Sequence, residues 1–176
     1  MYTDAQTSRR DLSVPVLAGF RNAGALERQT VNDLGQMLAG LSPELLPGVW
    51  VYAILPDGAP VPGSAAAVVQ EAEGRTVVLR AEDAHELGLT PLFQGRWITL
   101  HVRSCLTAVG LTARVASELA QAGIPANMLA GFYHDHLIVP EDLTKKALRC
   151  LERLQAGAAR LLSSTSPAAK RMETIS

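Results

Sequence analysis

The order of secondary-structure signals in residues 96–162 constrains the fold more than any other feature of this sequence. Residues 96–102 (RWITLHV) are rich in β-branched and aromatic side chains, which favour a strand. A helical spacing of apolar residues follows and ends at a glycine; its members are Leu111, Val115, Leu119 and Gly123. The segment therefore begins with a strand and then a helix over 111–121.

Two more strands and a second helix complete this order. Residues 127–133 and 136–140 predict a β-hairpin around His134-Asp135. The last helix is expected after Pro140, with acidic residues in its first turn and one apolar face. Strand, helix, strand, strand, helix is the order of a split βαβ, or ferredoxin-like, unit.

The first half of the chain repeats this order with one helix missing. Residues 49–55 predict a central strand, Gly74 the turn of a hairpin, and residues 81–89 a short helix. A Pro/Gly-rich loop over 56–64 takes the place of the first helix of the unit. A short helix from Thr30 is expected before all of these, closed by Ser42-Pro43.

We therefore expect an α+β fold of two ferredoxin-like lobes, each an antiparallel sheet with helices on one face. The expected ranges are 29–94 for the first lobe and 95–162 for the second, with an extension over 1–28 and a flexible tail over 163–176. A single α+β domain with an antiparallel sheet is the alternative.

Composition and charge exclude several classes of function. Hydrophobic residues make up 48% of the chain and charged residues 19%, which suits a packed core. A net charge of -1 offers no field that would attract nucleic acid or an anionic membrane, and no apolar window is long enough to span a bilayer. The two cysteines, Cys105 and Cys150, lack the spacing of a zinc or redox site. A cytoplasmic protein is expected.

Four short motifs in residues 97–140 resemble the small two-lobed bacterial ACT-domain proteins. They are Ser104-Cys105-Leu106, Val109-Gly110-Leu111-Thr112, Ala122-Gly123-Ile124 and Tyr133-His134-Asp135-His136-Leu137. The resemblance extends more loosely over residues 30–160, with Cys105 and the N-terminal extension as departures. It implies paired ACT-like lobes that bind a small molecule, an amino acid in the first instance, and regulate a partner without catalysis or a cofactor. Related paired lobes serve as arginine sensors in animals.

The turn from strand to helix at residues 103–112 is the expected ligand site. Backbone N–H groups at a helix start are unsatisfied and suit a carboxylate, while Gly110 allows close approach and hydroxyls are available nearby. The alternative is that Gly110 only permits a tight turn. With the facing hairpin, the expected ligand-binding residues are Ser104, Leu106, Val109, Gly110, Leu111, Thr112, Asn127, His134 and His136.

Metal binding and catalysis are not expected. A turn within the Tyr133-His136 segment would separate its two histidines, which favours a hydrogen-bonded hairpin tip or a ligand or partner contact over a metal site. His101 and Ser104 point to opposite faces of a strand, so they do not form a nucleophile and base pair. Trp50, Tyr52 and Trp97 are expected to pack in the core and not to form a ligand box.

Two hypotheses for function remain. In the first, an amino acid binds at the lobe interface and changes a contact with a partner protein or a second copy. In the second, the chain is a ligand-free interaction module that presents sheet edges or its last helix. A homodimer and a monomer are equally compatible with either hypothesis.

Overall fold

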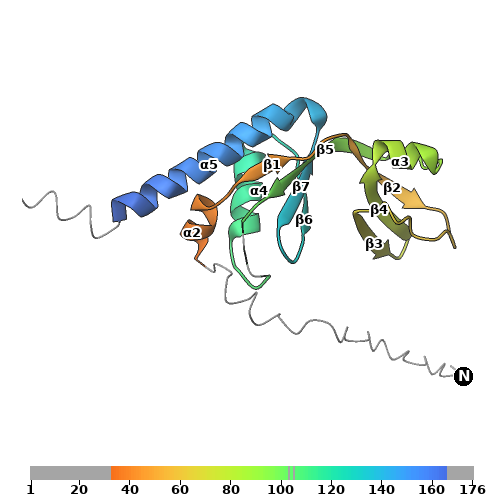
Figure 1. Cartoon of the computed structure of the whole chain (residues 1–176), viewed down its shortest axis with the longest axis horizontal. Helices are drawn as coiled ribbons and strands as arrows, with labels where there is room; N and C mark the ends of the chain where they lie inside the picture. The colour runs from red at the N-terminus through yellow and green to blue at the C-terminus, as the bar shows by residue number, and fades with distance from the viewer. Residues whose placement is uncertain (1–32, 103, 105, 166–176) are drawn as a thin grey trace, which may run out of the picture.

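Seven antiparallel strands form one sheet in the computed structural model, which describes residues 33–102, 104 and 106–165 (Figure 1). The strands are β1 (Pro43–Leu45), β2 (Trp50–Leu55), β3 (Ala67–Glu71), β4 (Gly74–Arg80), β5 (Phe93–Leu100), β6 (Asn127–Ala130) and β7 (Asp135–Val139). The helices are α2 (Leu34–Ala39), α3 (Ala81–Glu86), α4 (Leu111–Gln121), the short η1 (Glu141–Leu143) and α5 (Thr144–Thr165). The strand order is β3-β4-β2-β5-β7-β6, and β1 also pairs with β5.

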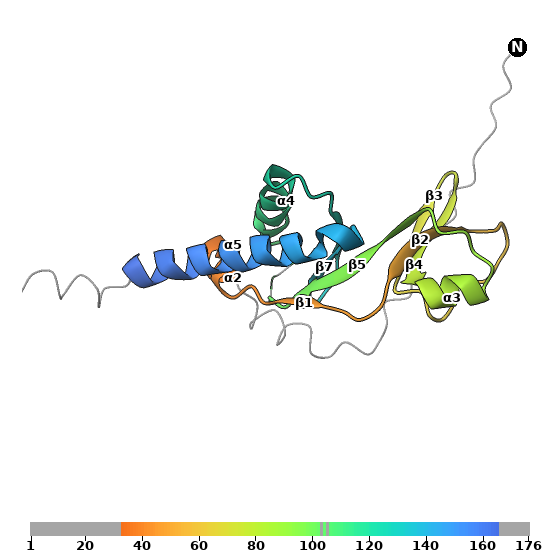
Figure 2. The same cartoon turned by 90° about the horizontal axis from the view of Figure 1, so that it is seen from above.

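Strand β5 is shared by the two halves of the molecule. Its residues 93–95 pair with β2, and its residues 96–100 pair with β7. We call β2, β3, β4 and α3 the first lobe, and β1, β6, β7 with α2, α4, η1 and α5 the second lobe; β5 belongs to both. Figure 2 shows the two lobes joined along β5. The expected α+β fold of ferredoxin-like lobes is confirmed.

Gly95 marks the point where β5 passes from one lobe to the other. It is buried, and a Cβ atom there would lie 2.8 Å from Ile138 Cγ2 and would also meet the carbonyl oxygen of Val139. Real Cβ atoms do not approach this closely, so the crossing requires a residue without a side chain. The tight fit of β5 against β7 depends on this glycine.

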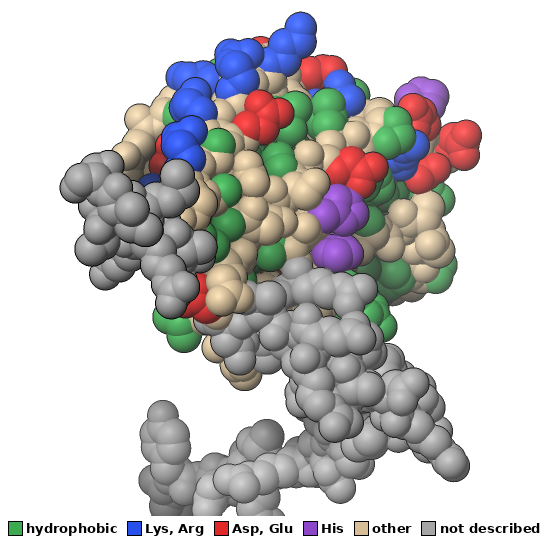
Figure 3. All heavy atoms as spheres, turned by 60° about the vertical axis from the view of Figure 1, so that its left-hand side comes forward, with side chains coloured by type: hydrophobic (Ala, Val, Ile, Leu, Met, Phe, Trp, Pro, Cys, Tyr) green, Lys and Arg blue, Asp and Glu red, His purple; other side chains and the backbone are tan. Residues whose placement is uncertain are grey.

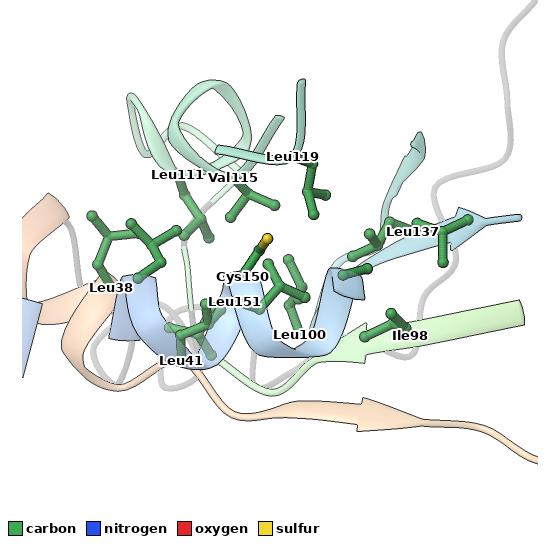
Figure 4. Close-up of a cluster of buried hydrophobic side chains, with 14 of the residues drawn as sticks. Leu38, Leu41, Ile98, Leu100, Leu111, Val115, Leu119, Leu137, Cys150 and Leu151 are labelled. Carbon is green, nitrogen blue, oxygen red and sulfur yellow. The ribbon is translucent and has the colours of Figure 1, made fainter. Parts of the chain in front are cut away.

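The main core lies between the sheet and the helices of the second lobe (Figure 4). Ile98 and Leu100 of β5 point toward α4 and α5, where they meet Val115 and Leu151, all four being buried. The apolar stripe of α4 predicted from residues 111, 115 and 119 is buried as expected. Cys150 also lies in this cluster with its thiol buried, so it packs as a small apolar side chain.

The first lobe has a smaller core because α3 is the only helix of the described residues that covers it. Its cluster holds Val51, Ala53 and Leu55 of β2, Val77 and Leu79 of β4, and Ala84 of α3. The Pro/Gly-rich loop between β2 and β3 forms turns and no helix, as the sequence predicts. The lobe therefore lacks one of the two helices of a complete ferredoxin-like unit.

A third cluster lies on the opposite face of the sheet, away from the helices. Trp97 and Trp50 pack here with ring centroids 4.7 Å apart, and Tyr52 meets Phe93 at 5.9 Å. The expected core packing of these aromatic residues is confirmed for Trp97, which is buried, while Trp50 and Tyr52 are partly buried against this cluster. Because β5 supplies Trp97 and Phe93 while β2 supplies the other two rings, the cluster joins the lobes across their shared strand.

Strand β1 was not predicted, and it packs against the second lobe although it precedes the first. Pro43 pairs with Leu100 and Leu45 with Ile98, and α2 packs on α5. The expected boundary between residues 94 and 95 falls within β5, which both lobes share. The lobe ranges 29–94 and 95–162 stay a prediction. The extension over 1–28 and residues 166–176 of the predicted tail lie outside the described residues, while α5 continues to Thr165.

Two other expectations need correction. Helix α2 is capped by Asp33, whose Oδ1 accepts a hydrogen bond from the Gln36 N–H at 2.8 Å, while Thr30 lies outside the described residues. The hairpin turn lies at residues 131–134, where the Gly131 N–H donates to the His134 carbonyl at 3.1 Å. Asp135 is therefore the first residue of β7 and not a turn residue. No helix in the described ranges has both the length and the hydrophobicity needed to cross a membrane.

Candidate functional site

The start of α4 is shaped by a glycine that no other residue replaces without strain. Gly110 has a left-handed φ of 104°, and a Cβ atom on it would lie 3.1 Å from Leu34 Cδ2. The N-cap residue of α4, Gly110, has no side chain to cap the helix, and the first backbone bond runs from the Arg114 N–H to the Gly110 carbonyl at 2.8 Å. The N–H groups of residues 111–113 thus have no acceptor among the described residues, and they carry the positive end of the helix dipole.

A buried carboxylate is hydrogen-bonded to a side chain in the first turn of α4. Thr112 Oγ1 donates a hydrogen bond to Asp135 Oδ2 at 3.4 Å, which joins the first turn of α4 to the start of β7. Asp135 is only 8% exposed, and this burial raises the pKa of its carboxyl group, while the Thr112 hydrogen bond and the nearby His136 oppose the rise. Donors and an acceptor of hydrogen bonds therefore stand close together at the end of the sheet.

His136 is held by a chain of hydrogen bonds on the other face of β7. Trp97 Nε1–H donates to Thr99 Oγ1 at 3.2 Å, and the Thr99 hydroxyl lies 3.1 Å from His136 Nδ1. Because Thr99 already accepts from Trp97, its own hydrogen is available for His136 Nδ1, which suits a neutral imidazole. Burial lowers the pKa of His136, and the charges of His134 and His101 lower it further, while Asp135 raises it.

His101 and His134 extend the site toward β1. Their ring centroids are 4.8 Å apart, and His101 Nε2 contacts a carboxylate oxygen of Glu44. His134 Nδ1 is buried and has no hydrogen-bond partner among the described residues. Figure 3 shows histidine side chains side by side on the surface. Polar groups from β1, β5 and the β6–β7 hairpin thus meet at one end of the second lobe.

The structure brings some of the expected ligand-binding residues together and separates others. Gly110, Leu111 and Thr112 lie at the helix start, but Leu111 is buried in the core, so only its backbone can reach a ligand. Asn127 pairs with Ile138 at the opposite end of the hairpin from Asp135. The other expected residues are Ser104, which is half-buried, Leu106 and Val109, which are exposed, and His134 and His136, described above.

Two residues of the site were missed by sequence reasoning. Asp135 was interpreted as an ordinary turn residue, although the Tyr-His-Asp-His motif that contains it was noted. Glu44 reaches His101 only because β1 pairs with the end of β5, a contact between distant segments. In the part of the chain that the structure describes, no three His, Cys, Asp or Glu side chains are placed to hold a metal ion.

Comparisons with known proteins agree on the architecture. Residues 29–96 match one family model described as ACT domain, and residues 92–153 match a second with the same description. The two matches overlap at the start of β5, the shared strand. No match was found among curated proteins.

Solved structures extend this comparison. A Vibrio cholerae protein of unknown function, described as a possible transport protein, has 40% sequence identity and a TM-score of 0.60, covering 69% of this chain and 95% of its own. An Agrobacterium tumefaciens protein has 18% identity and a TM-score of 0.50, covering 65% of this chain and 89% of its own. An aspartate kinase from Clostridium acetobutylicum, described as an allosteric enzyme, has 11% identity and a TM-score of 0.50, covering 73% of this chain and 37% of its own. The last two show likeness of fold alone.

Proposed function

Because the chain belongs to the ACT-domain family, with two such domains in tandem, we propose that it is a regulatory protein that binds a small molecule. ACT domains are regulatory and not catalytic, which supports a role without turnover. A cytoplasmic location and a homodimer stay predictions.

The ligand that fits the site best is a free α-amino acid. Its carboxylate would accept hydrogen bonds from the N–H groups of residues 111–113, which lack acceptors among the described residues. Its ammonium group would pair with Asp135, whose carboxylate is otherwise held only by Thr112 among the described residues. The contact between Thr112 and Asp135 carries this proposal. It joins the helix start, whose N–H groups would bind the ligand carboxylate, to the Asp135 carboxylate, which would bind the ligand ammonium group.

The flanking residues would determine which side chain is accepted. Leu106 and Val109 are 64% and 85% exposed, so the turn before α4 offers apolar surface to a ligand. Ser104 and His134 would supply polar contacts from either side of this turn. His136 points to the opposite face of β7 from Asp135, so it would not touch a ligand held there. Asn127 is the weakest member of the proposed set because it lies at the far end of β6.

A ligand-free interaction module is a second candidate, and one observation favours it. Phe132 and Tyr133 at the hairpin turn are 48% and 57% exposed, and their rings meet at 5.1 Å. With Leu106 and Val109, they place exposed apolar side chains on both loops at this end of the second lobe. Such a surface is also typical of a protein contact.

Calorimetric titration with each of the twenty amino acids, after ligand has been stripped from the protein, tests the first candidate. We expect one or a few amino acids to bind at micromolar to submillimolar concentration. Asp135→Asn should weaken that binding about tenfold or more, since a charge-assisted hydrogen bond contributes about 1.5–3 kcal/mol. Asp142→Asn, at an exposed acidic residue of η1, is the matched control.

Two results would contradict the amino-acid proposal. One is that no amino acid binds below millimolar concentration to protein whose thermal unfolding is normal. The other is that Asp135→Asn and Asp142→Asn bind the ligand equally well. In either case, retained association with a cellular partner that is lost on changing Phe132 and Tyr133 to serine would favour the interaction module.

A further inference from the structure

A groove between α2, α4 and α5 lies outside the site described above. It has a volume of about 640 Å³ and is lined by Leu38 of α2, by Arg114 and Glu118 of α4, and by Arg153, Leu154, Gly157, Ala158, Arg160, Leu161 and Ser164 of α5. None of the residues proposed to bind an amino acid lines it. Its volume lies within the range of roughly 300–1,000 Å³ that small-molecule sites occupy.

The groove carries unbalanced positive charge. Arg114 is paired with Glu118 at 3.4 Å, which leaves two more arginines in the lining. Arg153 donates only to the thiol of Cys150, at 3.1 Å, and the guanidinium of Arg160 has no acidic partner among the described residues. Figure 3 shows Lys and Arg side chains in a row along this side of the molecule. Guanidinium groups without an acidic partner among the described residues suit a ligand with a carboxylate, sulfonate or phosphate group.

The floor of the groove is apolar. Leu38 and Leu154 are each 7% exposed, and Ala158 packs beside them as a partly buried residue. A small inorganic anion would therefore contact the arginines and leave this apolar surface uncovered. The lining fits a molecule with an anionic group at one end and an apolar body at the other.

Gly157 supports this interpretation independently of the charges. It lies in the interior of the 22-residue α5, where glycine is less favourable than alanine because it loses more backbone entropy. No atom of the described residues lies within 4 Å of the position that a Cβ atom would take there, so packing within this part of the chain does not require a glycine. Its absence of a side chain keeps the groove open.

We propose that this groove is a second binding site, which takes a small organic anion with an aliphatic or aromatic body. The anionic group would lie against Arg153 and Arg160, and the apolar body would cover Leu38, Leu154 and the surface above Gly157. The site would be independent of amino-acid binding at the α4 start, so that one chain would respond to two ligands.

The test uses the full chain and the fluorescent probe anilinonaphthalene sulfonate, an aromatic anion. We expect one probe molecule to bind per chain and to be displaced by octanoate or by octyl phosphate, but poorly by octanol or by inorganic phosphate. The two octyl anions distinguish a carboxylate ligand from a phosphate ligand. Amino-acid binding measured in the same protein should be unchanged, so failure here is separable from failure of the proposed function.

Substitutions inside and outside the groove test whether the probe binds there. Gly157→Leu should weaken probe binding at least tenfold without lowering the melting temperature, because the leucine side chain enters open space in a helix. Gly63→Leu is its control, since Gly63 also has open space but lies in the loop between β2 and β3. The double variant Arg153→Gln and Arg160→Gln should weaken probe binding at least tenfold, and the exposed Arg149→Gln should not.

Three outcomes would overturn the proposal. Equal binding by the protein and its Gly157→Leu variant would place the probe elsewhere. Displacement by octanol as strong as that by octanoate would show an apolar surface without anion recognition. Displacement by an acidic amphipathic peptide but by neither octyl anion would make the groove a docking surface for a protein helix.

Discussion

The two lobes share a sheet and a strand but differ in what covers them. In the second lobe, α2, α4 and α5 bury a cluster that includes Leu100, Val115 and Leu151. In the first lobe, the six residues of α3 cover a cluster to which the helix itself contributes Ala84 and the strands β2 and β4 contribute the rest. A loop of prolines and glycines takes the place of the missing helix. The second lobe is therefore stabilised by its own core, whereas the first lobe depends more on its contacts with the second lobe for stability.

The difference also bears on the proposed ligand site. Helix α4 begins with N–H groups that no side chain of its N-cap residue satisfies, and a carboxylate, Asp135, is hydrogen-bonded to its first turn. Helix α3, which follows β4 directly, has no such carboxylate contact among the described residues. In the first lobe, the loop between β2 and β3 offers no such helix start. Two family matches therefore need not mean two equivalent ligand sites.

The largest expected effect comes from one substitution made in each lobe. Leu151 and Leu79 are both fully buried. Leu151 points from α5 into the core that α2 and α4 also line, and Leu79 of β4 lies under α3. We expect Leu151→Ala to lower the free energy of unfolding by about 4 kcal/mol and Leu79→Ala by about 2.5 kcal/mol, because a thinly covered site collapses more readily around a cavity. Urea denaturation followed by tryptophan fluorescence measures both. Equal losses would show that the lobes are equally rigid.

A second prediction tests whether the lobes unfold as one unit. Gly95→Ala should cost about 2 kcal/mol, because the new methyl group overlaps the Val139 carbonyl and Ile138. Since β5 belongs to both lobes, calorimetry should still show one transition, moved to lower temperature. Gly63→Ala, where a Cβ atom meets no atom of the described residues within 4 Å, should leave stability nearly unchanged. Two separate transitions in Gly95→Ala would mean that the first lobe unfolds alone.

The next effect concerns α2, which precedes the first lobe but packs on the second. Asp33→Ala removes the N-cap bond to Gln36 and should cost about 1 kcal/mol. Hydrogen exchange should rise in α2 and α5 and stay constant in β3 and β4. Asp57→Ala, in an exposed turn of the first lobe, is the control. Faster exchange in β3 would argue that α2 stabilises the whole sheet.

The smallest effect is a dependence on pH that arises in the second lobe. The folded pKa of His136 lies below its ordinary value of 6.5, so the unfolded chain binds more protons as pH falls through that value. Stability should therefore decrease from pH 7 toward pH 5. His136→Asn should flatten this decrease, whereas the exposed His85→Asn of α3 should not. Melting temperatures of the unchanged protein and of both variants, measured from pH 7 to pH 5, test this prediction.

Burial of Asp135 acts with the opposite sign and at lower pH. Its folded pKa lies above the ordinary value of 3.8, so its contribution to stability is largest below that value and is lost as pH rises through the folded pKa. Asp135→Asn should therefore raise the melting temperature more at pH 7 than at pH 4. A larger gain at pH 4 would contradict the burial of this carboxylate.

Local patterns were sufficient for most of the second lobe. The bounds of α4 follow from its apolar stripe and from Gly123, and the motif around Gly110 predicted the helix start that the structure shows. These features depend on residues close together in the chain. Spacing and turn chemistry therefore specify them without knowledge of distant contacts.

Contacts between distant segments could not be predicted in the same way. Strand β1 has three residues, too few for a periodic signal, and it is a strand because it pairs with the end of β5. The contact of Glu44 with His101 follows from that pairing and was missed with it. Asp135 was missed for another reason, since aspartate is common in turns and its burial depends on α4.

The position of β1 also has a consequence for how the protein is made. This strand leaves the ribosome early, but its partner residues 98–100 are synthesised only after the whole first lobe. Until then its edge groups have no native partner, and the first lobe lacks the strand that completes its own sheet. Neither lobe can finish folding during synthesis before the eight residues of β5 have been made, because both sheets include this strand.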